Sequence, residues 1–317
     1  MSTKAIISRA KRKIKSIAGI PLNYIKGRRS VEYVLQNKKE NEISIICTPL
    51  IGDTVYALSC LDALKTKNPE ARIHVYSYQK FSNLLSEYRA IDAITFIDKP
   101  GNEMLQGLDQ FLHFNGLCEW AKDRGVISAN PFYYKKCYNA DNPDCLYQMK
   151  THIFEVGEQA PTTYHLVCNG RKEREKIAIL NPYSYSTFEA NFGVYEEITE
   201  ALTALGYSVY TNVIKEQKTI KGSQELRCAI EELFKISCKA KVIVSARSGI
   251  LDYLIASDIN MFVVYENCSE RLKKMYHLAN WDRQGIIKEV YPGILGYSYQ
   301  NVITDFRAFL RSIEEQI

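Results

Sequence analysis

The chain has 317 residues, 46% of them hydrophobic and 24% charged, which is typical of globular proteins and long enough for two domains with separate cores. The first 39 residues hold eleven Lys or Arg and one Glu, so the rest of the chain is net acidic although the formal charge is +5. This distribution argues against a nucleic-acid groove in the body of the protein.

The basic residues at the start form an arm, residues 1–41. At 100° per residue, apolar side chains fall on one helical face and basic ones on the other, up to a break expected at Pro21. The apolar set is Ile6, Ile7, Ala10, Ile14, Ile17 and Ala18, and the basic set is Lys4, Arg9, Lys11, Arg12 and Lys15. Residues 4–29 are therefore expected to lie on an anionic membrane at the inner, cytoplasmic face. The alternative is a helix docked on its own protein with a solvated basic face.

Nine cysteines are spread singly along the chain, without a CxxC pair. Their odd number and the absence of a signal peptide predict free thiols in a reducing cytoplasm.

Two Rossmann-like domains are expected to follow the arm, at residues 42–170 and 171–303, before a final helix at 304–317. In the first, short β-branched strands alternate with helices that have one apolar face. Its strands are expected at 43–47, 72–76 and 93–97, whereas 130–161 has no clear period. In the second, strands are expected at 176–181, 207–211, 242–244 and 261–265, and helices at 194–205, 226–236 and 250–255.

The turn after the strand at 242–244 is chemically suited to an anion. The N–H groups of Ser248, Gly249 and Ile250 would open a helix, and Arg247 offers a planar fork that matches phosphate oxygens. Ligands of open α/β sheets sit beyond the carboxyl ends of the strands, where this turn lies. The alternative is an ordinary connecting loop with a solvated Arg247.

Several common motifs are missing. We find no GxGxxG, GxxxxGK[ST], HExxH or GxSxG, which argues against dinucleotide oxidoreductases, P-loop NTPases, zinc proteases and α/β-hydrolases. The sequence accordingly predicts no metal site and no cofactor. Asp53, in the turn after the first strand, has two possible roles: a helix N-cap, which the spacing alone favours, or a carboxylate that takes a proton from a substrate hydroxyl.

The stretch Leu50-Ile-Gly-Asp-Thr-Val-Tyr-Ala-Leu-Ser59, followed by Asn68-Pro69-Glu-Ala, resembles the N-terminal signature of the heptosyltransferase-like glycosyltransferases, family nine. Asn181-Pro182 and the segment 245–265 resemble the family's donor-domain motifs. The resemblance covers about residues 43–100 and 176–266. It implies a GT-B fold, with two facing Rossmann-like domains that hold acceptor and nucleotide-sugar donor, and inverting, metal-independent transfer.

Site residues follow from the same resemblance. Asp53 matches the family's general base. The turn 248–250 matches the site of the donor diphosphate, with Asn181 at the donor-domain entry. Glu266 is proposed from its position at the end of the strand expected at 261–265 and not from the resemblance: it is expected to contact the ribose or, alternatively, to be a solvated strand-end carboxylate.

The chain departs from the family in three places. Arg247 stands where the family has Asp or Asn, and Asp252 where it has His. The donor-domain Lys expected within 186–191 is missing. Our hypothesis is that Arg247 replaces the missing positive charge, with Asp252 either orienting Arg247 or contacting the ribose.

These observations favour a glycosyltransferase that acts on a glycan or lipid-linked acceptor in surface polysaccharide or glycoconjugate assembly. Two alternatives stay open: a non-catalytic nucleotide-sugar-binding or scaffold subunit, and a different sugar-processing enzyme such as an epimerase.

Overall fold

A computed structural model describes residues 21–315 except 112–113, 139–140, 167, 169–173, 185–190, 267, 279–284 and 294–295. Contacts within the chain divide it into two compact units. The first comprises residues 1–141 and 148–160, and the second comprises 142–147 and 161–317. The unit division therefore falls ten residues before the expected domain boundary at 170. Residues 4–20 of the predicted arm lie outside the described part of the chain.

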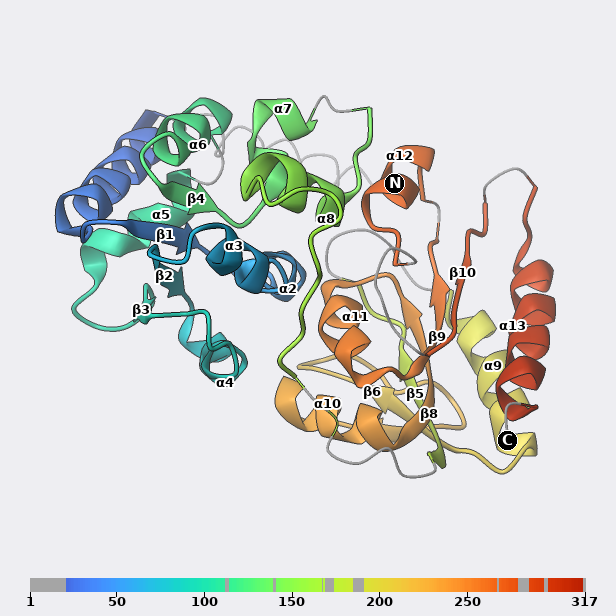
Figure 1. Cartoon of the computed structure of the whole chain (residues 1–317). Coiled ribbons are helices and arrows are strands. Elements are labelled where there is room, and N and C mark those ends of the chain that lie inside the picture. The colour runs from blue at the N-terminus through green and yellow to red at the C-terminus, as the bar shows by residue number, and fades with distance from the viewer. Residues whose placement is uncertain are drawn as a thin grey trace. The chain divides into compact units, whose positions relative to one another are not determined.

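The first unit is built on a parallel four-stranded sheet in the order β3-β2-β1-β4 (Figure 1). The strands are β1 (Glu42–Ile46), β2 (Arg72–Ser77), β3 (Ala93–Phe96) and β4 (Val126–Ser128). β4 was not predicted, because it has only three residues and follows a turn at Gly125, whose φ is +73°. The order places β1 between β2 and β4, so the turns after β1 and β4 lie at the same edge of the sheet.

Short helices connect and follow these strands. They are α2 (Ile51–Leu58), α3 (Leu61–Lys67), η1 (Gln79–Phe81), α4 (Ser82–Ser86), η2 (Glu103–Gly107), α5 (Leu108–Phe111), α6 (Asn115–Lys122), η3 (Pro131–Tyr133), α7 (Lys135–Tyr138), α8 (Cys145–Gln148) and η4 (Met149–Ile153). The segment 130–161, which has no periodic pattern in the sequence, is thus composed of single helical turns and irregular chain.

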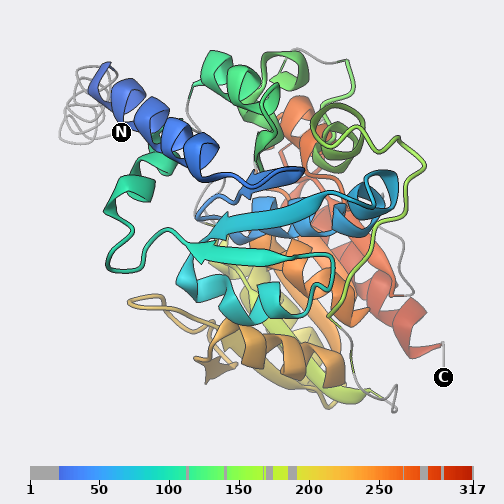
Figure 2. The ribbon, with the colours of Figure 1, turned by 60° about the vertical axis from the view of Figure 1, so that its left-hand side comes forward.

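A helix over residues 21–37 precedes the sheet and leads into β1 (blue in Figure 2). The described helix begins at Pro21, since proline is tolerated in the first turn of a helix, and the residues before the break expected there lie outside the described part of the chain. Val31 and Val34 are buried, and Ser30 donates its hydroxyl to the carbonyl of Met104 at 2.6 Å. This part of the expected arm is therefore packed onto the first unit.

At Gly27 this helix packs directly against the backbone of α5. A Cβ at Gly27 would lie 2.5 Å from the backbone nitrogen of Phe111, whereas a Cβ at Gly116, in α6, would meet nothing within 4 Å. We expect Gly27→Ala to lower the free energy of unfolding by about 1–3 kcal/mol, because backbone atoms must shift. Gly116→Ala is the matched control and is expected to be neutral or stabilising, since alanine favours helix. Urea denaturation of both variants measures the difference, and equal stabilities would contradict this packing.

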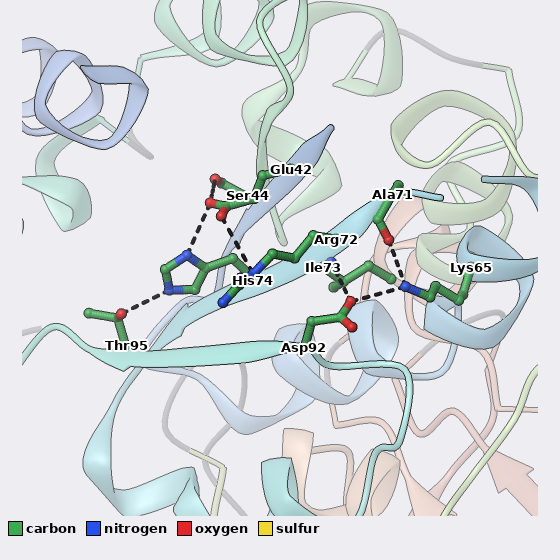
Figure 3. Close-up of polar contacts among 9 residues, drawn as sticks. All are labelled: Glu42, Ser44, Lys65, Ala71, Arg72, Ile73, His74, Asp92 and Thr95. Atoms are coloured by element: carbon green, nitrogen blue, oxygen red, sulfur yellow. Dashed lines mark hydrogen bonds and ion pairs between the residues drawn. The ribbon is translucent and has the colours of Figure 1, made fainter. Parts of the chain in front are cut away.

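A buried polar cluster joins three strands of this sheet (Figure 3). The carboxylate of Glu42 accepts a hydrogen bond from Ser44 at 3.1 Å and contacts Nδ1 of His74 at 3.0 Å, while Nε2 of His74 lies 2.8 Å from the hydroxyl of Thr95. Burial lowers the pKa of His74, although the nearby Glu42 opposes the shift. Glu42 is the first residue of β1, Ser44 and His74 are paired in register, and Thr95 lies in β3, so we interpret the cluster as a brace across β1, β2 and β3.

The second unit contains a parallel six-stranded sheet in the order β10-β9-β8-β5-β6-β7. The strands are β5 (Glu175–Asn181), β6 (Ser208–Asn212), β7 (Gln224–Leu226), β8 (Ala240–Ala246), β9 (Asn260–Val264) and β10 (Ile287–Val290). The edge strands β7 and β10 were not predicted. β7 has three residues, two of them exposed, and the last of them, Leu226, falls at the start of the helix expected at 226–236, which begins only at Ile230.

Helices cover both faces of this sheet (Figure 1). α9 (Phe192–Ala204) and α13 (Tyr299–Glu314) pack together over one face, and α10 (Ile230–Lys239) and α11 (Gly249–Leu254) pack over the other. η5 (Ile255–Ser257) and α12 (Glu270–Met275) complete the unit. The final helix, expected at 304–317, spans Tyr299–Glu314 in the structure and begins with a capping box formed by Ser298 and Asn301.

One cysteine pair corrects the expectation of free thiols. Cys168 and Cys238 form a disulfide, with Cα atoms 5.5 Å apart and a separation of 70 positions in sequence. The other seven cysteines are free, and all of them except Cys228 are buried. The sequence could not show this pair, because the two residues meet only after α10 folds beside the segment before β5.

Candidate active site

Asp53 lies in the first turn of α2, just beyond the carboxyl end of β1. The helix begins at Ile51 and its N-cap is Leu50, so the expectation that Asp53 is the N-cap is wrong. Its carboxylate oxygen Oδ2 instead accepts hydrogen bonds from the hydroxyl of Thr48 at 3.0 Å and from the amide of Asn130 at 2.8 Å. Two donors on one oxygen fix the direction of the carboxylate.

Asn130 is a site residue that the sequence did not reveal. It follows β4, and its Oδ1 accepts a hydrogen bond from the backbone N–H of Phe132 at 2.9 Å, which turns its NH₂ group toward Asp53. Tyr133 lies close enough to Asp53 that the carboxylate adds to the effect of burial, and both raise the pKa of its phenol. The edge of the first sheet therefore presents an oriented carboxylate beside amide and phenol groups.

In the second unit, a polar network joins three strands at the carboxyl edge of the sheet. Asn181, the last residue of β5, donates from Nδ2 to the hydroxyls of Ser245 at 2.9 Å and Ser248 at 3.2 Å. Its Oδ1 accepts a hydrogen bond from Asn212, at the end of β6, at 3.0 Å. Asn181 thus connects β6 and β8 to the turn that was expected to bind an anion, and Asn212 is a further residue that the sequence did not reveal.

The turn 247–250 has the expected strand-to-helix geometry. β8 ends at Ala246, and Ser248 is the N-cap of α11 with an extended backbone. The hydroxyl of Ser248 does not cap this helix and instead meets Asn181. Gly249 and Ile250 form the first helical positions, so their N–H groups lie at the carboxyl edge of the sheet.

Arg247 does not present a free fork, as the hypothesis of a phosphate contact requires. It is 4% exposed, and its guanidinium forms a two-pronged ion pair with Asp252, at 2.7 and 3.1 Å. It also donates to the carbonyls of Ser248 at 2.7 Å and Tyr276 at 2.8 Å. Of the two expectations for Asp252, the geometry supports the orientation of Arg247.

Glu266 is buried next to the start of α9, with 2% of its surface exposed. The alternative of a solvated carboxylate is therefore wrong. Oε1 accepts the N–H of Asn191 at 2.6 Å, and Oε2 accepts the hydroxyl of Tyr299 at 3.3 Å. Burial raises the pKa of Glu266, and the two hydrogen bonds oppose this effect.

The raised pKa of Glu266 predicts a pH-dependent stability. The folded protein binds the proton of Glu266 more tightly than the unfolded chain does. The stability that Glu266 contributes is therefore fully present below its pKa in the unfolded chain, and it is lost as the pH rises through its pKa in the folded protein. Glu266→Gln imitates the protonated form. We expect the variant to gain stability relative to the wild type as urea denaturation is repeated from pH 4 to pH 7.5. A difference between the two proteins that does not change with pH would contradict this assignment.

The position of the family's donor-domain Lys, within 186–191, lies almost wholly outside the described residues. Among the residues that the structure describes, no three His, Cys, Asp or Glu side chains are arranged to hold a metal ion. In the same part of the chain, no helix is both long and apolar enough to span a bilayer.

Comparison with known proteins finds likeness in structure only. No family model matches the sequence, and no curated protein matches it either. Among solved structures, the chain is similar to the ADP-heptose lipopolysaccharide heptosyltransferase II of Escherichia coli, with a TM-score of 0.58 and 12% identity over 86% of this chain and 99% of that one.

Two further solved structures are equally similar. A family nine glycosyltransferase of Veillonella parvula has a TM-score of 0.58 and 12% identity, covering 88% of this chain and 99% of that one. The Escherichia coli heptosyltransferase WaaC with ADP has a TM-score of 0.58 and 14% identity, covering 86% and 99%. The chain therefore shares the α/β fold of the family nine, GT-B heptosyltransferases, as the sequence motifs predicted.

Proposed function

We propose that the protein is a glycosyltransferase that moves a sugar from a nucleotide-sugar donor to a glycan or lipid-linked acceptor, with inversion and without a metal ion. The observation that carries the proposal is the carboxylate of Asp53, fixed by Thr48 and Asn130 at the carboxyl edge of its sheet. The shared fold with family nine enzymes supports it, as does the motif around Asp53.

The chemistry of such a transfer divides between the two units. Asp53 accepts the proton of an acceptor hydroxyl as the oxygen attacks the anomeric carbon. The leaving diphosphate is stabilised by the N–H groups of Ser248, Gly249 and Ile250, in the turn that Asn181 secures. Glu266 is proposed to contact the donor's ribose. We now assign Arg247 and Asp252 to positioning this turn, because their charges are already paired.

A panel of nucleotide sugars tests the proposal. Purified protein is incubated with ADP-, UDP-, GDP- and CMP-sugars and a glycan acceptor mixture, and released nucleotide is measured. An ADP-sugar belongs in the panel because WaaC was solved with ADP. Release that depends on the acceptor supports a transferase. The absence of release and of binding with every donor would overturn the proposal.

The second candidate is a non-catalytic nucleotide-sugar-binding or scaffold subunit. The buried Arg247–Asp252 pair favours it, since it stands where the family uses other residues and offers no free charge to the leaving group. In the same panel this candidate predicts binding of one nucleotide sugar without turnover in the presence of acceptor.

We also propose that the N-terminal region binds an anionic membrane surface, as expected for residues 4–29, with surface glycoconjugate assembly as the biological role. Within the described part, Leu22 and Ile25 are 56% and 47% exposed on the helix 21–37, and Lys26 and Arg29 are exposed on the same face. An apolar face edged by basic residues suits the boundary between lipid headgroups and acyl chains.

Reversal of two of these charges tests the membrane contact. We expect Lys26→Glu/Arg29→Glu to reduce flotation with phosphatidylglycerol vesicles by at least about tenfold, because each basic residue contributes on the order of 1 kcal/mol. The matched control, Lys235→Glu/Lys239→Glu on exposed positions of α10, is expected to float like the wild type. Equal flotation of the two variants would remove this helix from the membrane proposal.

A further inference from the structure

The carboxyl ends of β9 and β10 carry a hydrogen-bond network that reaches the turn 247–250. Tyr265, directly after β9, is fully buried. Its hydroxyl lies 2.5 Å from Oε1 of Glu289 and 2.8 Å from the carbonyl of Tyr276. Glu289, in β10, also accepts the N–H of Leu278 at 3.0 Å and pairs with His277 at 2.9 Å. The segment 276–278 is therefore held to both strands.

The same segment is joined to the proposed donor turn through a single carbonyl group. The carbonyl of Tyr276 accepts two hydrogen bonds, one from Nε of Arg247 at 2.8 Å and one from the hydroxyl of Tyr265. Arg247 in turn holds the carbonyl of Ser248 and the carboxylate of Asp252. A continuous series of contacts thus runs from Glu289 through the segment 276–278 and Arg247 to Ser248.

The charges in this series explain why it should be rigid. The side chains of Arg247, Asp252, Tyr265 and Glu289 are each less than a tenth exposed, so the hydrogen bonds among them are largely shielded from water. Charge-assisted bonds in such surroundings are stronger than neutral ones, and leaving one partner unpaired is costly. A turn held in this way binds an anion without first being ordered, and ordering is a main cost of binding.

We propose that Tyr265 and Glu289 are positioning residues for the donor turn. They fix the position of the segment 276–278. This segment fixes the guanidinium of Arg247, which in turn fixes the backbone of Ser248, Gly249 and Ile250. This inference rests on the proposed function, because it takes that turn as the site of the donor's diphosphate.

The chain supplies a matched control at the opposite end of the same sheet. Tyr207, which precedes β6, is also buried and donates its hydroxyl to a carboxylate, that of Glu314 in α13. Tyr207→Phe and Tyr265→Phe therefore remove the same kind of hydrogen bond and keep the ring. The tilted ring contact of residue 265 with Tyr291, with centroids 4.7 Å apart, is retained in the second variant.

Titration calorimetry with ADP, UDP and GDP separates positioning from stability. We expect Tyr265→Phe to weaken binding of the nucleotide that the wild type binds by about five- to tenfold, since one hydrogen bond of the network is lost. Tyr207→Phe should bind like the wild type although it melts at a similarly lowered temperature. Equal affinities of the two variants would overturn the inference. A wild type that binds none of the three nucleotides or their sugars would remove the proposed function and this inference with it.

Glu289 provides a second, independent readout. Glu289→Gln keeps a side-chain oxygen that accepts the N–H of Leu278. Glu289→Ala removes this oxygen, so that the N–H of Leu278 and the hydroxyl of Tyr265 both lose their acceptor at position 289. We expect Gln to restore most of the nucleotide affinity that Ala loses. The corresponding variants of Glu314 should leave the affinity unchanged. If Gln and Ala at position 289 both bind nucleotide as the wild type does, the inference fails even where Tyr265→Phe cannot be purified.

Discussion

Asp53→Asn is expected to lower the turnover of sugar transfer by about 10²- to 10⁴-fold, which is the range that a positioned general base contributes. Asparagine has nearly the same shape, and its side-chain oxygen can still accept the hydrogen bonds of Thr48 and Asn130, so the fold of the turn should be kept. The variant loses only the ability to take a proton. Initial rates of nucleotide release with saturating donor and acceptor measure the effect.

The control for this variant is a carboxylate at the same edge of the same sheet. Asp98 follows β3, is exposed and accepts the N–H of Gln79 at 2.8 Å. Asp98→Asn should leave turnover unchanged. Calorimetry should show that Asp53→Asn still binds the donor nucleotide, because the proposed donor site belongs to the second unit. An Asp53→Asn protein that turns over at the wild-type rate would exclude Asp53 as the base.

The central strands were predictable because each is a run of apolar, β-branched residues bounded by turns. β1, β2, β5, β8 and β9 lie within about two residues of the expected positions. β4, β7 and β10 were missed because short strands at the side of a sheet take their structure from the neighbouring strand and not from their own composition. The edge strand β3 is the exception, because its apolar run was predicted as a strand at 93–97.

In the candidate site, likewise, features formed by neighbouring residues could be predicted and contacts between residues far apart in sequence could not. The turns carrying Asp53 and Ser248 follow from local strand-turn-helix patterns. Asn130 lies 77 residues from Asp53 in sequence, and nothing near either residue indicates that their side chains meet. The pairing of Arg247 with Asp252 is local, but only the structure shows that both side chains are buried and that the guanidinium is held by this carboxylate. Sequence patterns identified the residues, and the structure adds which of them are buried and which are paired.

The largest effect on stability is expected at this pair. Asp252→Asn leaves the guanidinium of Arg247 buried without a counter-charge, and breaking a buried ion pair in this way costs about 3–5 kcal/mol. We expect Asp252→Asn to lower the free energy of unfolding by about 3 kcal/mol, at the low end of this range, because the carbonyls of Ser248 and Tyr276 still accept hydrogen bonds from Arg247. Urea denaturation followed by circular dichroism measures the unfolding of the second unit.

The double variant Arg247→Met/Asp252→Leu separates stability from positioning. Replacing both charges by apolar side chains of similar size removes the unpaired charge, so we expect the double variant to regain most of the stability that Asp252→Asn loses. Glu225→Gln, which breaks an exposed pair with Arg227 in the same unit, should change stability by less than about 1 kcal/mol. If Asp252→Asn were no more destabilising than Glu225→Gln, Arg247 would have to be stabilised by its carbonyl partners alone. The carboxylate would then be free to have another role, such as the contact with the donor's ribose.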